Sequence, residues 1–194
     1  MKLLSSTIAA AALALTAGAA QAETQNYVLD ASHSQIVFSY NHLGYSTTYG
    51  MFSGFEGEIA FDKENPGNSS VSVAMPVRSM ITGWEGRFEH FMGDDFFGAD
   101  DDNDLVTFTS TGIEVTGEDT ALITGDLTLN GVTKSVVLDA KLNGMGTHPM
   151  AQKDWAGFDA TTTLVRSDFN VGAFAPFVSD EVEVLISIEA MIAE

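Results

Sequence analysis

The side chains that could support chemistry in this 194-residue chain are four histidines and a large excess of carboxylates. The histidines are His33, His42, His90 and His148, and no two of them have the spacing of the H-E-x-x-H zinc motif. A metal site built from distant histidines stays open. No G-x-S-x-G sequence could supply a serine nucleophile, and the absence of cysteine excludes thiol catalysis and thiolate-bound metals. We therefore expect no catalytic residue, no resident metal and no cofactor.

The acidic loop Asp94–Asp104 has a partial resemblance to a calcium-binding loop. Asp100, Asp102 and Asp104 alternate along the chain as the acidic ligands do in the first half of an EF-hand loop. Its sixth position is Leu105 instead of glycine, and its twelfth is Thr111 instead of glutamate, so the tight turn and the bidentate ligand are both missing. Cation binding here stays an open alternative to the simpler interpretation, a solvated surface.

The elements that must position these side chains are predicted to be strands, because the apolar residues after residue 26 recur mainly with a period of two. The clearest example is 182–190, where Val182, Val184, Ile186 and Ile188 alternate with polar residues, with Leu185 as the one exception. Further strands are expected near 35–41, 59–62, 71–78, 105–110, 121–129, 135–142 and 160–166. Strands at this spacing with one apolar face predict an antiparallel sandwich or barrel.

Turn residues separate these strands, and one segment has a helical period. Pro66-Gly67-Asn68, Gly117-Glu118-Asp119, Asn130-Gly131 and Asn143-Gly144 are predicted turns. Between Met80 and Phe97 apolar residues recur at intervals of three and four, which predicts a short helix inserted between two strands. Three glycines lower its intrinsic helix propensity, so packing must hold it.

Length and charge limit the class of protein. The length fits one domain. The chain has 27 acidic against 8 basic residues, a formal charge of −19, while 45% of its residues are hydrophobic. This composition suits a folded domain, and its charge disfavours partners with phosphate backbones, so we expect no nucleic-acid partner.

The first 22 residues are predicted to be a cleavable signal peptide. One basic residue, Lys2, precedes an apolar stretch over 3–17, and Ala20-Gln21-Ala22 has the small-x-small pattern that a signal peptidase cuts. The mature domain would then span 23–194 and reside in the periplasm. No later segment is long and apolar enough to cross a bilayer, so no stable membrane insertion is expected.

The apolar residues leave two interpretations of the interior open. The chain contains 13 Phe and 8 Met, many of them between residues 38 and 108. They can fill a solid core, or they can line a cavity, because an eight-stranded barrel either packs full of side chains or encloses one small ligand.

The order of several motifs resembles that of the YceI-like family. They are Tyr27-x-x-Asp30-x-x-His33-Ser34-x-Ile36-x-Phe38, His42-x-Gly44, Gly50-x-Phe52-x-x-Phe55-x-Gly57-x-Ile59-x-Phe61-Asp62, Arg87-x-x-His90, Asp95-Phe96-Phe97, Val106-Thr107-Phe108, 125–134 and Arg166-Ser167-Asp168-Phe169. The resemblance spans essentially the whole mature chain. It implies a lipocalin-like antiparallel β-barrel of about eight strands with one short helical insertion, in the periplasm, which binds a polyisoprenoid or isoprenoid-quinone lipid in its interior.

This resemblance leads to a set of expected ligand-binding residues. Polar residues at one end would receive the head of the lipid, and the candidates are Arg87, His90 and Arg166. The inward apolar positions expected to contact the tail are Ile36, Phe38, Phe52, Phe55, Met75, Ile81, Phe91, Phe97, Phe108, Leu127 and Leu129. Such a site would draw affinity from burial of the tail and specificity from the shape of the tunnel.

Three functions from different classes follow. The leading hypothesis is a non-enzymatic periplasmic carrier or store of an isoprenoid lipid. The second is an accessory enzyme or stress factor acting on a small amphiphile, with His90 and Arg87 as the reactive pair. The third is a structural β domain with a filled core. A homodimer stays open in each case.

Overall fold

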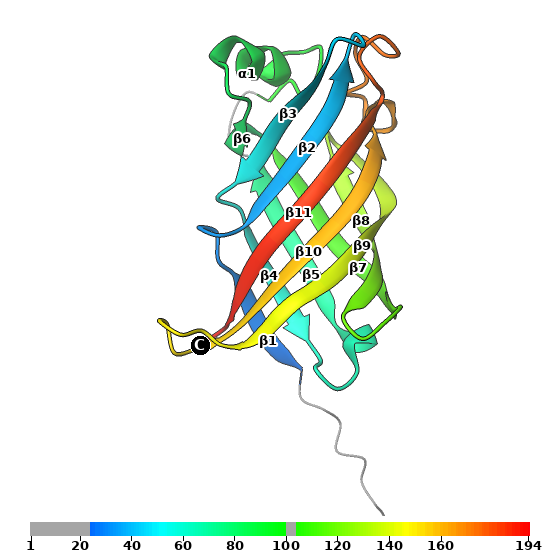
Figure 1. Cartoon of the computed structure of the whole chain (residues 1–194). Helices are drawn as coiled ribbons and strands as arrows, with labels where there is room; N and C mark the ends of the chain where they lie inside the picture. Colours follow the sequence, from blue (N-terminus) through cyan, green and yellow to red (C-terminus); the bar gives the residue numbers. More distant parts are fainter. Residues whose placement is uncertain (1–23, 100–103) are drawn as a thin grey trace, which may run out of the picture.

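A closed barrel of eight antiparallel strands forms the body of the computed structural model, which describes residues 24–99 and 104–194 (Figure 1). The strands of the whole sheet are β1 (Gln25–Leu29), β2 (Gln35–His42), β3 (Ser46–Ser53), β4 (Glu56–Phe61), β5 (Ser70–Pro76), β6 (Met80–Ile81), β7 (Leu105–Val115), β8 (Thr120–Leu129), β9 (Val132–Thr147), β10 (Asp154–Val165) and β11 (Glu181–Ile192). The expected lipocalin-like barrel is confirmed, which decides between the sandwich and the barrel.

The ring closes through β11, whose edge pairs with two successive strands. β1 pairs with the last part of β11, with Leu29 opposite Ala190, while β2 pairs with its first part, with Phe38 opposite Val184. The closed order is β1-β4-β5-β7-β8-β9-β10-β11, and β2, β3 and β6 extend the sheet beside the first half of β11. The interior is therefore walled at one end by β1 and β4 and at the other by β2, β3 and β6.

Alternation along the strands separates the core from the surface. On β11, Val182 and Val184 are buried while Glu181 and Glu183 are exposed, as the period of two predicts. One cluster of buried apolar residues runs along the barrel, and Tyr27 and Phe55 are its largest fully buried members.

Two details of the sheet differ from the prediction. Asn143-Gly144 is not a turn: β9 continues through it, and a bulge lies opposite Gly157 and Phe158 of β10. Bulges and turns favour the same residue types, so the dipeptide alone does not distinguish them. The prediction also omitted three strands. Polar residues and Gly50 interrupt the apolar pattern of β3, and β1 and β6, with five and two residues, are too short to show a period clearly.

The predicted helical insertion is confirmed as α1 (Glu85–Met92), and three short 3-10 turns, η1 (Pro66–Asn68), η2 (Val77–Ser79) and η3 (Arg166–Phe169), complete the elements. α1 is shorter than the helical period suggested, because Gly83 has a φ of 76° before it and Gly93 ends it. Among the described residues, no helix is both long and apolar enough to span a membrane.

Two expectations lie outside the described residues. The predicted signal peptide, residues 1–22, precedes the first described position, and most of the acidic run 100–104 falls in the gap at 100–103.

Candidate ligand cavity in the barrel

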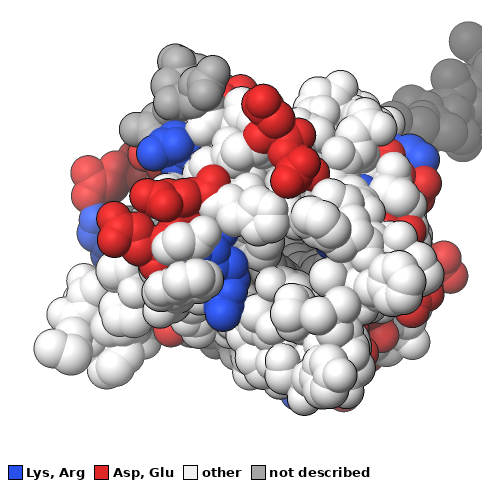
Figure 2. Space-filling view, turned by 90° about the horizontal axis from the view of Figure 1, so that it is seen from above, with Lys and Arg blue, Asp and Glu red and all other residues white. Residues whose placement is uncertain are grey.

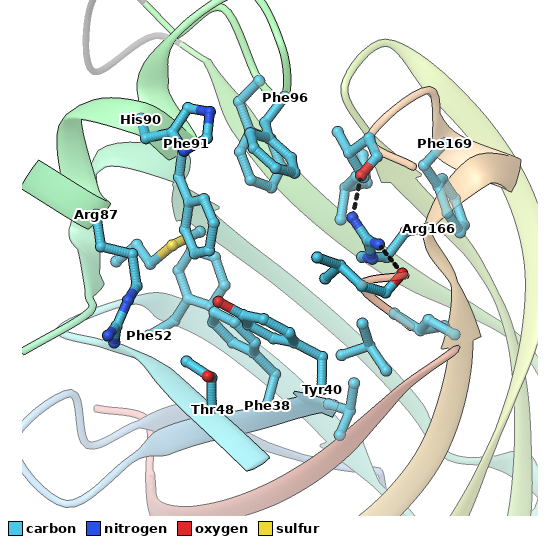
Figure 3. Close-up of a pocket in the computed structure, with 18 of the residues that line it drawn as sticks. Phe38, Tyr40, Thr48, Phe52, Arg87, His90, Phe91, Phe96, Arg166 and Phe169 are labelled. Carbon is cyan, nitrogen blue, oxygen red and sulfur yellow. Dashed lines mark hydrogen bonds between the residues drawn. The ribbon is translucent and has the colours of Figure 1, made fainter. Parts of the chain in front are cut away.

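A cavity of about 480 Å³ occupies the end of the barrel next to α1. Its walls come from β2 and β3, from the inner side of α1 and from the loop between β10 and β11 (Figure 3). In the view from above, the mouth appears as a hollow bordered mainly by residues that are neither acids nor bases (Figure 2). Its volume lies in the range of sites that enclose small organic ligands.

Aromatic rings and aliphatic side chains form most of the wall. Phe38 and Phe52 approach each other from β2 and β3, with ring centroids 5.8 Å apart, and Phe91 of α1 packs against Phe96 at 5.1 Å. Such a wall offers contact area and few hydrogen bonds, which suits an apolar guest.

A second cavity of about 210 Å³ lies toward the opposite end of the barrel, where η1 and the β7–β8 turn are found. Ile36 and Met75 line both cavities. The interior is thus hollow on both sides of this pair, and the filled-core alternative does not describe it.

The structure brings most of the expected ligand-binding residues to these two cavities. The first is lined by Ile36, Phe38, Phe52, Met75, Arg87, His90, Phe91, Phe97, Leu129 and Arg166. The second is lined by Phe55 and Phe108, together with Ile36 and Met75. Whether these residues contact a ligand stays a prediction.

Two expected residues lie elsewhere. Ile81 was predicted to point inward, and this is wrong: its side chain is 49% exposed. On the two-residue strand β6, Met80 opposite Phe52 takes the inward position, so the next residue points outward. Leu127 is buried in the core but lines neither cavity.

Arg166 lines the cavity, but its hydrogen bonds go to the backbone. Its guanidinium donates to the carbonyl oxygens of Val171, Ala173, Val178 and Ser179 at 2.9–3.2 Å. Burial lowers the pKa of this guanidinium below its ordinary value, and the nearby carboxylate of Asp180 opposes the shift. Arg166 therefore holds the β10–β11 loop around one side of the mouth and contributes positive potential there.

Arg87 makes fewer hydrogen bonds to the protein than Arg166, the other arginine that lines the cavity. Its side chain projects from α1 toward β3, and one N–H donates to the carbonyl oxygen of Thr82 at 2.8 Å. A guanidinium has five N–H donors, and among the described residues Arg87 has no carboxylate partner. It can therefore donate to a polar group at the mouth.

His90 lies beside the mouth with an acidic partner and two aromatic neighbours. Its Nε2 is 3.4 Å from Oδ2 of Asp95, and its ring contacts Phe96 and Phe174 with centroids 5.1 and 5.8 Å apart. These contacts orient the imidazole as part of the aromatic border.

Tyr40 is a cavity residue that the sequence prediction missed. It lines the first cavity from β2, and its hydroxyl has no hydrogen-bond partner among the described residues. Thr48 of β3 lines the same part of the wall (Figure 3). The period of two from Ile36 through Phe38 extends to Tyr40, so the strand pattern places Tyr40 on the inward face, although it was not among the expected ligand-binding residues.

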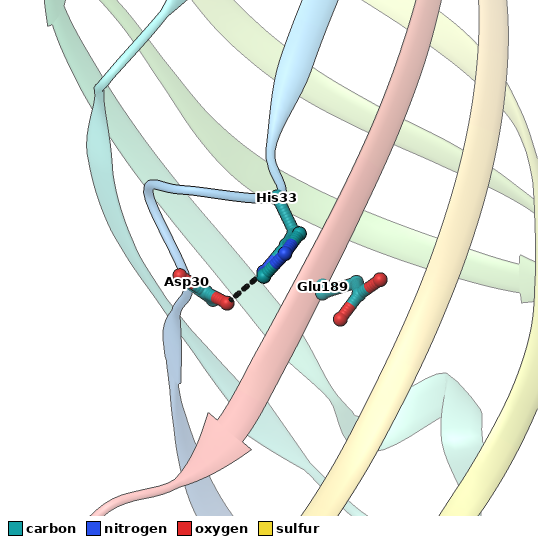
Figure 4. A group of neighbouring side chains, drawn as sticks. All are labelled: Asp30, His33 and Glu189. Atoms are coloured by element: carbon teal, nitrogen blue, oxygen red, sulfur yellow. Dashed lines mark hydrogen bonds and ion pairs between the residues drawn. The ribbon is translucent and has the colours of Figure 1, made fainter.

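A possible set of metal ligands lies outside the barrel, at the turn between β1 and β2. Asp30, His33 and Glu189 place one ligand atom each within 4.8 Å of one another (Figure 4). Hydrogen bonds already engage them: Nδ1 of His33 is 2.6 Å from Oδ2 of Asp30, and Glu189 accepts from the indole of Trp155. The backbone N–H of Asp30 also donates to the carbonyl oxygen of Glu189 at 2.8 Å, so the group fastens the turn to β11.

Both the sequence and the structure of this chain are similar to those of known proteins. The model of the YceI-like domain matches residues 27–190. A UPF0312 protein of Ectopseudomonas mendocina is 40% identical over 97% of this chain and 99% of its own length. The YceI protein of Campylobacter jejuni has a similar structure, with 29% identity, a TM-score of 0.69 and coverage of 79% and 90%. A polyisoprenoid-binding domain from Saccharophagus degradans, 15% identical, shares the fold with a TM-score of 0.67 and coverage of 86% and 98%.

Proposed function

Because this chain belongs to the YceI-like domain family, we propose that it is a non-enzymatic carrier or store of an isoprenoid lipid. The observation that carries this proposal is the apolar cavity of about 480 Å³, with hydrogen-bond donors near its mouth. The polyisoprenoid-binding domain of the same fold supports the ligand class.

The cavity walls suit the tail of such a lipid. Each methylene-sized group moved from water into an apolar site contributes about 0.8 kcal/mol. Several isoprene units would therefore supply most of the affinity without hydrogen bonds. The second cavity beyond Ile36 and Met75 offers further apolar space for the end of a longer tail, provided these side chains move.

The donors near the mouth favour a head group that accepts hydrogen bonds. Arg87 has N–H groups to spare and the Tyr40 hydroxyl is unpaired among the described residues, while Arg166 adds positive potential. Quinone carbonyls and the oxygens of a polyprenol derivative are such acceptors. We propose Arg87 and Tyr40 as the head-binding pair.

The binding test compares two substitutions on one strand. Thr48→Trp places a large side chain inside the cavity, whereas Thr47→Trp places the same group on the exposed outer face of β3. In a titration with a soluble isoprenoid quinone, we expect saturable binding by the wild type and Thr47→Trp and at least about tenfold weaker binding by Thr48→Trp. Equal binding by the two variants, or no uptake by the wild type, would refute the proposal.

Native mass spectrometry of protein purified from its own host identifies the ligand. We expect an additional mass that organic extraction releases as an apolar compound. Repeated recovery of protein without such a mass, together with no uptake of added lipid, would contradict a carrier role.

We also propose that the protein acts after export and performs no chemistry on its ligand. The predicted cleavage after Ala22 supports export, and N-terminal sequencing of the mature protein should begin at Glu23. If the protein performs no chemistry, the added lipid should be recovered unchanged from both the wild type and the His90→Ala variant. Lipid turnover by the wild type that His90→Ala abolishes would establish the enzyme alternative instead.

A further inference from the structure

The mouth of the cavity is surrounded by exposed apolar side chains from three separate segments. We call this set the apolar rim: Leu43 and Tyr45 from the β2–β3 turn, Trp84 before α1, and Phe174 and Phe177 from the β10–β11 loop. Tyr45 is 90% exposed, Phe177 75% and Trp84 67%. Large apolar side chains gathered around one opening indicate an interaction surface, whereas scattered ones need no explanation.

Backbone contacts hold two of these segments together. The N–H of Leu43 donates to the carbonyl oxygen of Phe177 at 3.0 Å, and His42 forms an isolated β-bridge with Val178. Arg166 fixes the same loop from inside through its four carbonyl contacts. The exposed side chains are thus presented by fastened turns.

Two members of the apolar rim have a backbone conformation that their side chains disfavour. Leu43 and Phe174 have φ angles of 58° and 65°, in the left-handed region. Among the described residues, the other non-glycine positions with positive φ are Asn130, Gln152 and Asn170, and asparagine favours this region more than a bulky apolar residue does. The chain therefore exposes apolar groups at two positions where a small polar residue would fit the backbone better, and such outliers concentrate at functional sites.

The segments that bear most of the apolar rim carry no formal charge, although the chain has a charge of −19. No Asp, Glu, Lys or Arg occurs in residues 31–55 or 169–179. Seen from above, acidic groups lie to the left of the hollow, above it and along the right-hand edge of the molecule, while white surface borders the hollow itself on its right and lower sides (Figure 2). The opposite end of the barrel includes Glu118, Asp119 and Glu194. At the mouth end, acidic side chains such as Glu85 and Asp95 belong to α1 and the segment after it, so the uncharged segments give the apolar rim a side that can approach an apolar partner.

We infer that the apolar rim is a docking surface for the interfacial region of a phospholipid bilayer. Trp, Tyr and Phe side chains are favourable at the depth of lipid head groups, where their rings leave water without reaching the hydrocarbon centre. When the protein docks through the apolar rim, the mouth of the cavity faces the membrane. An apolar molecule can then pass between the bilayer and the cavity without crossing open water. The docking itself does not depend on what the cavity holds.

The net charge sets the preferred lipid. A strongly acidic protein is repelled by an anionic surface, and salt screens this repulsion. We therefore expect the protein to bind phosphatidylcholine vesicles more strongly than vesicles that contain phosphatidylglycerol. Added salt should increase binding to the anionic vesicles and leave binding to the neutral ones nearly unchanged.

The test uses two rim residues that do not line the cavity. Tyr45→Asp combined with Phe177→Asp places charges in the apolar rim, and Met150→Asp places one on an exposed side chain of the β9–β10 loop at the other end. In flotation with phosphatidylcholine vesicles, we expect the double variant to bind at least about tenfold more weakly than the wild type, and Met150→Asp to bind like the wild type. Both should take up soluble quinone normally, so that loss of docking and loss of the cavity ligand are distinguished.

The tryptophans report which end meets the lipid. In Trp155→Phe the only tryptophan is Trp84, and brominated phosphatidylcholine should quench its fluorescence; in Trp84→Phe quenching should be lost. Three outcomes would overturn the inference: no flotation of the wild type, equal flotation of the double variant, or sedimentation that shows a dimer which the double variant disrupts in the absence of lipid. The last would assign the apolar rim to a second copy of the chain.

Discussion

The ring of Phe38 lies over Gly50, its partner on the neighbouring strand, so closely that a Cβ at the glycine would fall 2.1 Å from Cζ of the ring. A similar close approach occurs between β7 and β8, where a Cβ at Gly125 would fall 2.3 Å from Cζ of Phe108, although the register partner of Gly125 is Ser110. In both places a missing side chain lets a phenyl ring lie against the sheet instead of projecting across the interior. The barrel thus has aromatic walls and still encloses space.

Gly50→Ala should therefore reduce the cavity from within the wall. The added methyl group forces Phe38 toward the cavity, and we expect a loss of about 1–3 kcal/mol in the free energy of unfolding together with weaker uptake of an isoprenoid quinone. Urea unfolding and a ligand titration measure the two effects. Gly146→Ala is the control, because nothing lies within 4 Å of a Cβ at that strand position. Equal behaviour of the two variants would show that the ring does not limit the cavity.

Arg166→Met should loosen the loop between β10 and β11. The substitution removes four donors and leaves the carbonyl oxygens of 171, 173, 178 and 179 without them, so we expect a loss of about 2–4 kcal/mol in the free energy of unfolding. Limited proteolysis should cut the loop faster than in the wild type. Lys134→Met, which breaks the exposed pair with Asp168, should change stability by less than about 1 kcal/mol. An uncut loop in the arginine variant would contradict this role.

The period-two pattern predicted the walls better than it predicted the ends of the barrel. Side-chain alternation on β2 and β11 follows from strand geometry alone, which is why inward residues such as Phe38 and Val184 could be found in the sequence. Ile81 was misplaced because β6 has two residues, and no period can be read from so short a strand.

The role of Arg166 could not be predicted for a different reason. Its acceptors are backbone carbonyls 5 to 13 positions later in the chain, and any residue type supplies a carbonyl. A cationic side chain that binds a loop therefore looks the same in sequence as one that binds a ligand. The need for glycine at positions 50 and 125 could not be predicted either, because it arises from a phenyl ring on the adjacent strand that lies against each of them.

The pair of Asp30 and His33 should give stability a defined pH dependence. Hydrogen bonding to Asp30 raises the pKa of His33 above its ordinary value, and hydrogen bonds from Ser32 and His33 lower the pKa of Asp30. The histidine contribution is fully present below the pKa of the unfolded chain, about 6.5, and is lost as pH rises through the raised folded value. The aspartate contribution is present above about 3.8 and is lost as pH falls through the lowered value.

His33→Asn should consequently destabilise the protein in a pH-dependent way. The difference in unfolding free energy between wild type and variant should be largest near about pH 5, where both partners are charged, and should shrink toward about pH 9. Urea unfolding at the two pH values measures it. His42→Asn is the control, because His42 is exposed and its side chain has no hydrogen-bond or ion-pair partner among the described residues. A difference independent of pH would mean that the charge of the imidazole contributes nothing to the turn seen in Figure 4.

Leu43→Asn should separate stability from membrane docking. Leu43 has a φ of 58° and an exposed side chain, so asparagine relieves backbone strain and removes little buried contact; we expect stability to rise by about 0.5–1 kcal/mol. Flotation with phosphatidylcholine vesicles should weaken because one apolar group leaves the rim. Leu105→Asn, at an exposed leucine in β7 without positive φ, should gain no stability and float like the wild type. If Leu43→Asn were less stable than the wild type, the leucine would be held by packing at the turn, and its strain would no longer argue for a function at the mouth.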